Sequence, residues 1–207
     1  MNTDVPRRGR PRDPERLKRV LEAAAQQFLE HGLERASVEA IAKASGVSKV
    51  TIYSYFPTKE ALFEAAVASC TEEVFASIPR GALDPRDPEN ALTLIGKAFL
   101  QLKRSDKAVG TFRLMFAVTS QHAEACEAFY RQGPEELIHQ VADYLRAAAS
   151  AGSLSIRNAD EAADQFLALF LGSADIRLML GLGKPKASED ARLIKANVDL
   201  FLRAYAK

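Results

Sequence analysis

The sequence has no tryptophan, three histidines and two cysteines, which limits the chemistry it can support. Cys70 and Cys126 are far apart and form no CxxC motif, so we expect reduced thiols rather than a disulfide or a redox pair. The sequence lacks GxSxG, HExxH and a phosphate-binding glycine loop. His31, His122 and His139 do not suggest a Ser or Cys triad. We therefore predict a chain that is not an enzyme and needs no cofactor.

One group of side chains has residue types that can bind a metal ion. His122 and Cys126 stand four residues apart, which places them on one face of a helix, and Glu124 and His139 are nearby in the sequence. A structural zinc site needs four convergent ligands, and this group lacks a second clustered Cys or His. Ordinary surface or interface residues are the favoured interpretation, so no metal is predicted.

Long hydrophobic runs are also missing. The most apolar segment, residues 166–183, is interrupted by Ser173, Asp175 and Arg177, whereas a membrane-spanning helix needs about 20 mostly apolar residues. The arginines of residues 7–12 are not followed by the apolar stretch of a signal peptide. We expect a cytoplasmic protein with no membrane association.

Charge of one sign is scarce over the whole chain but unevenly distributed. The formal net charge is +1, yet residues 1–60 carry 11 Lys/Arg against 8 Asp/Glu, and residues 61–207 carry 17 against 19. Seven of the cations fall within residues 7–19. Such a basic arm can bind phosphates, although a solvated tail would have the same composition.

What the sequence does have is helical periodicity. It is rich in Ala and Leu and shows no strand-like alternation, so we predict an all-α protein of roughly nine helices. Capping residues mark the expected helix starts: Asp13, Ser37, Ser48, Thr58, Asp87, Asp160 and Ser188. Gly133-Pro134 is expected to separate two helices, and the helix from Asp160 is expected to reach Leu180.

Residues 38–56 have the spacing of a helix-turn-helix. Ile41 and Ala42 belong to the buried side of a first helix, and Gly46 falls where the turn needs a positive φ. Ile52 and Phe56, four residues apart, turn one side of the second helix inward. The residues left facing outward or near the rim are Lys49, Val50, Thr51, Tyr53 and Tyr55, a surface suited to phosphates and base edges in a major groove. Tyr53 also fits a partly buried aromatic role, and Lys49 a solvated cation.

Residues 10–67 resemble the N-terminal domain of the tetracycline-repressor (TetR) family of transcriptional regulators. The matching motifs are Phe28-x3-Gly32, Ser37-Val38-x2-Ile41-Ala42, Ala44-Ser45-Gly46-Val47-Ser48, Thr51-Ile52-Tyr53-x-Tyr55-Phe56 and Lys59-Glu60-x-Leu62. Two C-terminal motifs, Phe129-Tyr130-x2-Gly133-Pro134 and Gln165-Phe166-x-Ala168-Leu169, look like the AefR-like branch. The resemblance implies a DNA-binding domain over residues 1–60 and a ligand-binding and dimerisation domain over residues 61–207.

The resemblance also implies roles for individual residues. Thr51, Tyr53 and Tyr55 would contact DNA, Ser37, Ser48 and Lys59 would meet phosphates or the DNA backbone, and Arg10 and Arg12 would form an arm that enters a minor groove. Lys49 and Val50 would add contacts to phosphate and base. Val50 departs from the family pattern, in which many relatives have Gly or Ala, and so suggests an apolar contact with a thymine methyl.

The last two expected helices have wide apolar bands, which predicts pairing with their twofold copies in a homodimer. A cavity for a small-molecule effector is implied among the C-terminal helices. Candidate lining residues are Phe112, Met115, Phe116, Phe129, Phe166 and Phe170, with Arg113 as a polar anchor, although each also fits ordinary core packing.

We therefore predict a homodimeric regulator, most often a repressor in this family, that leaves a palindromic double-stranded DNA operator when a mostly apolar ligand binds. Two alternatives remain open. One is a DNA-architectural or anti-repressor protein that uses the same motif without a ligand, and the other is a helical enzyme with an incidental motif.

Overall fold

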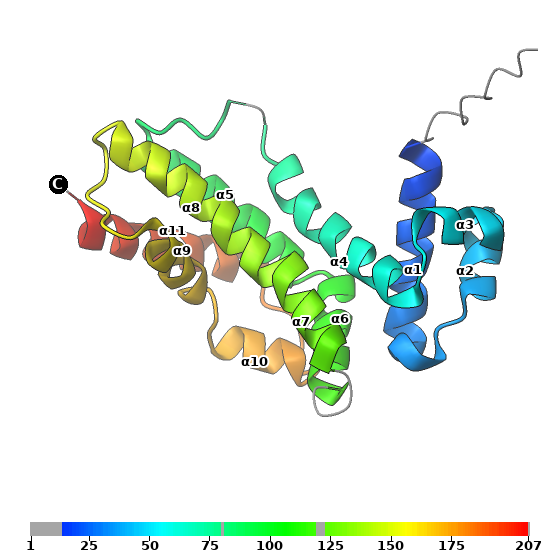
Figure 1. Cartoon of the computed structure of the whole chain (residues 1–207). Helices are drawn as coiled ribbons and strands as arrows, with labels where there is room; N and C mark the ends of the chain where they lie inside the picture. Colours follow the sequence, from blue (N-terminus) through cyan, green and yellow to red (C-terminus); the bar gives the residue numbers. More distant parts are fainter. Residues whose placement is uncertain (1–13, 80, 119–122, 207) are drawn as a thin grey trace, which may run out of the picture.

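The computed structural model describes residues 14–79, 81–118 and 123–206, and all regular structure within them is helical (Figure 1). The elements are α1 (Pro14–Arg35), α2 (Val38–Ser45), α3 (Lys49–Tyr55), α4 (Lys59–Ala76), α5 (Pro88–Lys103), α6 (Asp106–Val118), α7 (Ala123–Tyr130), the π-helical segment η1 (Arg131–Glu135), α8 (Glu136–Ser150), α9 (Ala159–Ala168), α10 (Ser173–Met179) and α11 (Ala187–Tyr205). The predicted all-α class is confirmed, with more helices in this part of the chain than the nine expected.

Two hydrophobic cores organise these helices. The first gathers buried residues of α1 to α4 and adds Met115 of α6. The second gathers those of α5, α8, α9 and α11 and adds Ile78, which follows α4. In Figure 1 α4 runs from the α1–α3 unit on the right toward the larger bundle on the left. This arrangement makes α4 the connection between the two units.

Several expected caps are present. Ser37 and Ser48 accept hydrogen bonds from the backbone N–H groups of Ala40 and Thr51, as N-cap residues do. Asp87 accepts one in the same way at the start of α5. Capping chemistry therefore located these helix starts from local sequence alone.

Two expected starts are wrong. Asn158, not Asp160, caps α9, because its side-chain oxygen accepts from the N–H of Glu161. Ser188 lies inside α11, and the N-cap residue is Lys186. The Glu189 carboxylate accepts a hydrogen bond from the backbone N–H of Lys186, which caps the helix there. Asp13, the cap expected for α1, lies outside the described residues.

The expected long helix from Asp160 to Leu180 is broken in two. α9 ends at Ala168, and α10 begins at Ser173, where the Asp175 carboxylate accepts from the backbone N–H of Gly172 at 3.1 Å. Phe170, between the two helices, is fully buried in the second core. Among the described residues no helix is both long and apolar enough to cross a membrane.

Gly133 and Pro134 do not interrupt the chain as expected. They lie within η1, which joins α7 to α8 without a loop. A π-helical turn, with its i→i+5 hydrogen bonds, is wider than a regular α-helical turn. Such turns are common near functional sites. Both residues line the cavity described below.

The corner between α2 and α3 has the predicted geometry. Gly46 has φ 68° and ψ 23°, and its N–H donates to the carbonyl of Ala42. Val47 and Ile52 are buried beside Ile41 in the first core. A Cβ atom at residue 46 would meet no atom within 4 Å, so only the backbone conformation favours glycine there.

Substitutions at Gly46 should therefore rank by their tolerance of the left-handed conformation. We expect Gly46→Val to lower stability by about 1–2 kcal/mol, and Gly46→Asn to cost less because asparagine adopts this conformation more readily. Thermal unfolding of both variants measures the order. Equal melting temperatures for Gly46→Val and the unsubstituted chain would contradict it.

Candidate nucleic-acid interface and ligand cavity

The α2–α3 corner presents one side of α3 to solvent. Val50 is 81% exposed, whereas Ile52, two residues later, is 1% exposed in the first core. Tyr53 is 39% exposed, so its side chain is partly covered and partly accessible. α3 is thus held by a single buried face, and the opposite face is free to enter a groove.

Hydroxyl groups gather at the start of α3. The Ser48 and Thr51 hydroxyls lie 2.8 Å apart, and the Ser48 oxygen also accepts from the Thr51 N–H. Both side chains stay partly or fully exposed. The start of a short helix and two hydroxyls therefore meet at one point, where they could donate to phosphate oxygens.

Lys49 is held in place by neighbouring side chains. Its ammonium group pairs with the Glu39 carboxylate of α2 and lies 5.8 Å from the centre of the Tyr53 ring. The hydrogen bond to Glu39 raises the pKa of Lys49, and the same bond lowers the pKa of Glu39. Both groups are exposed, so DNA phosphates could displace the pair without uncovering a buried charge.

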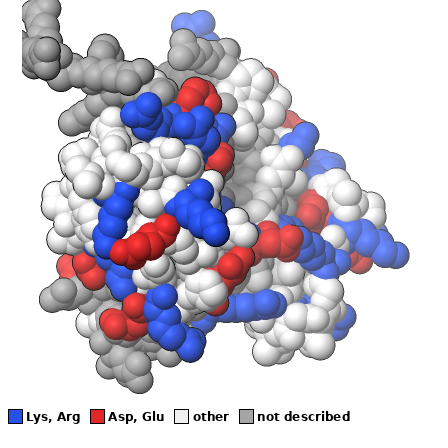
Figure 2. All heavy atoms as spheres, turned by 90° about the vertical axis from the view of Figure 1, so that its right-hand side faces the viewer, with Lys and Arg blue, Asp and Glu red and all other residues white. Residues whose placement is uncertain are grey.

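The remaining candidate DNA contacts are spread around this unit. The Ser37 hydroxyl donates to Glu39, the Lys59 ammonium donates to the carbonyl of Glu34 at 2.8 Å, and the Tyr55 and Phe56 rings are 6.3 Å apart. Arg10 and Arg12 lie outside the described residues. Figure 2 views the molecule from the side of this unit and shows basic and acidic side chains interspersed, not a patch of one sign.

A cavity of about 780 Å³ lies between the two units. Its wall includes Phe28 of α1, Phe63 of α4, Phe99 of α5 and Leu137 of α8. A space of this size accepts a small organic molecule, and most of its lining is apolar. A bound molecule would therefore touch helices of both cores.

The structure brings together some of the seven candidate ligand contacts and separates others. Phe112, Phe116 and Phe129 line the cavity, and the Phe112 and Phe129 rings meet edge to face at 5.2 Å. The other four lie elsewhere: Arg113 donates to the carbonyls of Leu178 and Met179, Met115 is buried in the first core, and Phe166 and Phe170 are buried in the second. Helical periodicity cannot distinguish a core aromatic residue from a cavity wall, which explains this mixture.

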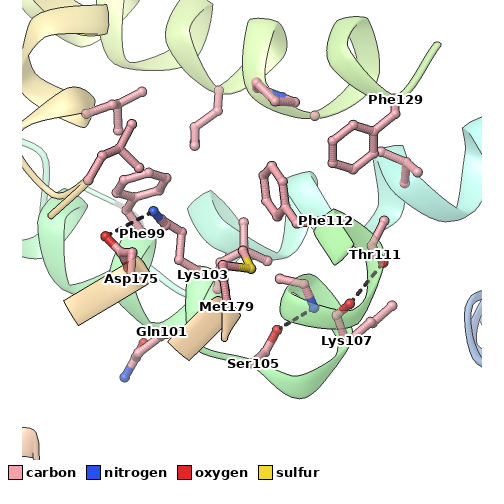
Figure 3. Close-up of a pocket in the computed structure, with 18 of the residues that line it drawn as sticks. Phe99, Gln101, Lys103, Ser105, Lys107, Thr111, Phe112, Phe129, Asp175 and Met179 are labelled. Atoms are coloured by element: carbon pink, nitrogen blue, oxygen red, sulfur yellow. Dashed lines mark hydrogen bonds and ion pairs between the residues drawn. The ribbon is translucent and has the colours of Figure 1, made fainter. Parts of the chain in front are cut away.

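Sequence reasoning missed a pair of charged residues in the cavity wall. Lys103, at the end of α5, and Asp175, in α10, lie with Nζ and Oδ2 3.4 Å apart (Figure 3). Each residue is only 8% exposed. Burial lowers the pKa of Lys103, and the charge of Asp175 opposes that shift. The two residues are 72 positions apart, so no local sequence pattern predicts their contact.

No three His, Cys, Asp or Glu side chains converge as a metal site within the part of the chain that the structure describes. Cys126 is a free thiol whose sulfur lies 3.9 Å from the carbonyl of Met115. His139 is exposed, and His122 falls outside the described residues.

Two family models together match most of the chain. Residues 20–66 match the bacterial regulatory proteins of the tetR family, and residues 90–207 match the C-terminal domain of AefR-like transcriptional repressors. The nucleoid occlusion factor SlmA of Aliivibrio fischeri is 29% identical over 51% of this chain and 53% of its own. The chain thus spans about half the length of this curated relative. The HTH-type transcriptional regulator YvkB of Bacillus subtilis is 28% identical over 79% of this chain and 84% of its own.

Solved structures share the fold. The flavonoid-responsive regulator FrrA has a TM-score of 0.73 and 34% identity, and the alignment covers 94% of this chain and 98% of that one. A TetR transcriptional regulator from Agrobacterium tumefaciens has a TM-score of 0.73 at 20% identity, with 94% and 96% covered. At that identity the second likeness concerns the fold alone.

The cavity should take up apolar aromatic probes, and filling it should prevent this. Ala108 of α6 lines the cavity, so Ala108→Phe should weaken binding of N-phenylnaphthylamine about tenfold or more, because the new ring occupies the ligand space. Fluorescence titration measures the affinity. Ala147→Phe, on the exposed side of α8, is the matched control and should bind the probe normally. Equal affinities for the two variants would argue against this cavity as the binding site.

Proposed function

Since the chain belongs to the TetR family of bacterial transcriptional regulators, in its AefR-like branch, we propose that it is a homodimeric repressor released from a palindromic operator by a small, mostly apolar ligand. Members of this family are non-enzymatic DNA-binding regulators, and this chain is one of them. The observation that carries the ligand-dependent part is the composition of the cavity wall, which includes α1 of the DNA-binding unit and α4, the helix that connects this unit to the larger bundle.

The proposed DNA contacts are made by the exposed side of α3. Thr51 and Tyr53 would read base edges or hold phosphates, Val50 would meet a thymine methyl, and Lys49 would exchange Glu39 for a phosphate. Two copies of α3, related by the dimer axis, would enter major grooves about one helical turn apart. Tyr55 would add to base discrimination, and Arg10 and Arg12 would form an arm that enters a minor groove. Ser37, Ser48 and Lys59 would contact the DNA backbone and fix the register.

Operator affinity should depend on Thr51 and Tyr53. We expect Thr51→Ala and Tyr53→Ala each to cost about 1–3 kcal/mol in binding an operator selected from random DNA, as for loss of one good contact. Electrophoretic mobility shifts at fixed salt measure the affinity.

The matched controls are Thr93→Ala in α5 and Tyr130→Ala in α7, both exposed and distant in sequence from α3. If all four variants bind the operator equally well, these contacts are wrong. A wild-type chain that selects no sequence and whose binding is insensitive to every effector would instead favour the DNA-architectural alternative.

The proposed dimer interface uses the outer sides of α9, α10 and α11. Five exposed large apolar residues lie in this part of the chain: Leu182 and Leu200, which do not line the cavity, and Leu171, Ile176 and Leu180, which also line it. The exposed positions of α9 include Asp160, Glu161 and Asp164, and those of α11 include Arg192, Lys195 and Arg203. A twofold axis would let the acidic side of α9 meet the basic side of the partner's α11, which is the complementarity that an isologous interface needs.

Light scattering after size exclusion should give twice the 22.6 kDa mass of one chain at micromolar concentration. Leu200→Glu should shift the population toward monomer, because a carboxylate would be buried at the interface without a partner. Ala147→Glu, on the exposed side of α8, is the control and should remain dimeric. A monomeric wild-type chain would refute the interface.

Ligand release follows from where the cavity lies. A molecule that favours a wider spacing of α1, α4 and α5 would bind one arrangement of the two units better than the other, and so shift the population toward it. Because each α3 is attached to α1 and α4 through the first core, the separation of the two recognition helices would change with it. FrrA, a relative over nearly the full chain, is named as flavonoid-responsive, which supports an aromatic effector here.

A further inference from the structure

The cavity wall contains one buried pair of opposite charges among the described residues, Lys103 and Asp175, whereas the other charged residues of the wall, Lys107 and Asp164, are more exposed. The Lys103 ammonium also lies 5.7 Å from the centre of the Phe99 ring, so an aromatic face covers part of its surroundings. In Figure 3 the pair lies beside Phe99, away from Phe112 and Phe129. The cavity thus has a charged place on one side and aromatic rings on another.

The hydrogen-bonding capacity of this pair is not used up within the protein. Asp175 Oδ2 faces the ammonium and accepts from the Gly172 N–H, while Asp175 Oδ1 is buried with no hydrogen-bond partner among the described residues. An ammonium group carries three donors, and Asp175 is the acceptor that the described structure provides at ion-pair distance. One acceptor and further donors therefore remain for a bound molecule.

Leaving such groups unsatisfied is costly in an apolar environment. A neutral hydroxyl group satisfies both, because its oxygen accepts from an ammonium while its hydrogen is donated to a carboxylate.

We propose that the effector is an uncharged aromatic molecule with a hydroxyl group, which Lys103 and Asp175 bind through hydrogen bonds at the polar side of the cavity. This inference rests on the proposed function, since it concerns the ligand of the same cavity. The ring system would pack against three aromatic residues of the wall. In Figure 3, Phe99 lies beside the polar pair, and Phe112 and Phe129 lie away from it.

The charges of the pair exclude other chemistries. Because Lys103 and Asp175 neutralise one another, a carboxylate ligand attracted by Lys103 would be repelled by Asp175, and an amine would meet the reverse. A methyl ether could accept from Lys103 but could not donate to Asp175. The pair would therefore favour a hydroxyl group over a methyl ether because only the hydroxyl group can donate a hydrogen bond to Asp175.

Biphenyl and three para-substituted derivatives of it test this directly: hydroxybiphenyl, methoxybiphenyl and biphenylcarboxylate. Isothermal titration of the full chain should show hydroxybiphenyl binding about tenfold or more tighter than each of the others, the factor for a hydrogen bond to a charged group. Lys103→Met/Asp175→Asn removes both charges and keeps an acceptor for the Gly172 N–H. It should reduce the hydroxyl preference to about threefold or less.

Lys97→Met is the matched control, because Lys97 is an exposed lysine of α5 that does not line this cavity. It should keep the wild-type preference, and operator binding by each variant checks that it is folded. Equal binding of all four probes, tightest binding of the carboxylate, or an unchanged preference in the double variant would overturn the inference. A chain that binds N-phenylnaphthylamine but none of the four probes would also overturn it and leave the ligand cavity standing. A chain that binds neither would remove the proposed ligand response as well.

Discussion

The packing of α4 is the constraint on which the rest of the structure depends. Leu62 and Phe63 at its start are buried in the first core, and Ile78 just beyond its end is buried in the second. The Phe63 ring also packs edge to face on Phe28 of α1 at 5.3 Å. Because both residues line the cavity, the same contacts that stabilise the DNA-binding unit form part of the ligand wall. Close-packed interiors transmit displacement rather than absorb it, so in the proposed ligand response these contacts would carry a change in one unit to the other.

A second constraint is the short helix α10, which the structure fixes at both ends. Asp175 near its start pairs with Lys103, and Arg113 of α6 donates to the carbonyls of Leu178 and Met179 at its end. A buried ion pair is weak evidence for stability, because desolvation offsets much of its attraction. Its value here is positional. It holds a polar group in an apolar cavity wall. Two aliphatic residues at these positions would stabilise the fold but would give no selectivity for the proposed hydroxyl-bearing ligand.

Electrostatics favours DNA only locally. The chain is nearly neutral, and acidic side chains are mixed with basic ones on the side that bears α3 (Figure 2). Sequence-independent attraction to phosphates grows with the number of cations engaged, so the described surface alone predicts modest non-specific binding. Recognition would then depend on the few groups around Ser48, Thr51 and Tyr53, whose positions the Gly46 corner sets.

The sequence by itself determined the features that depend on neighbouring residues: the all-α class, the corner at Gly46, the caps at Ser37, Ser48 and Asp87, and the exposed side of α3. These follow from backbone sterics and hydrogen bonds within a few positions. Only the tertiary structure decided which aromatic residues line the cavity and that Lys103 meets Asp175. Those outcomes depend on which helices pack together across long stretches of chain, and the periodicity of a single helix carries no information about its neighbour.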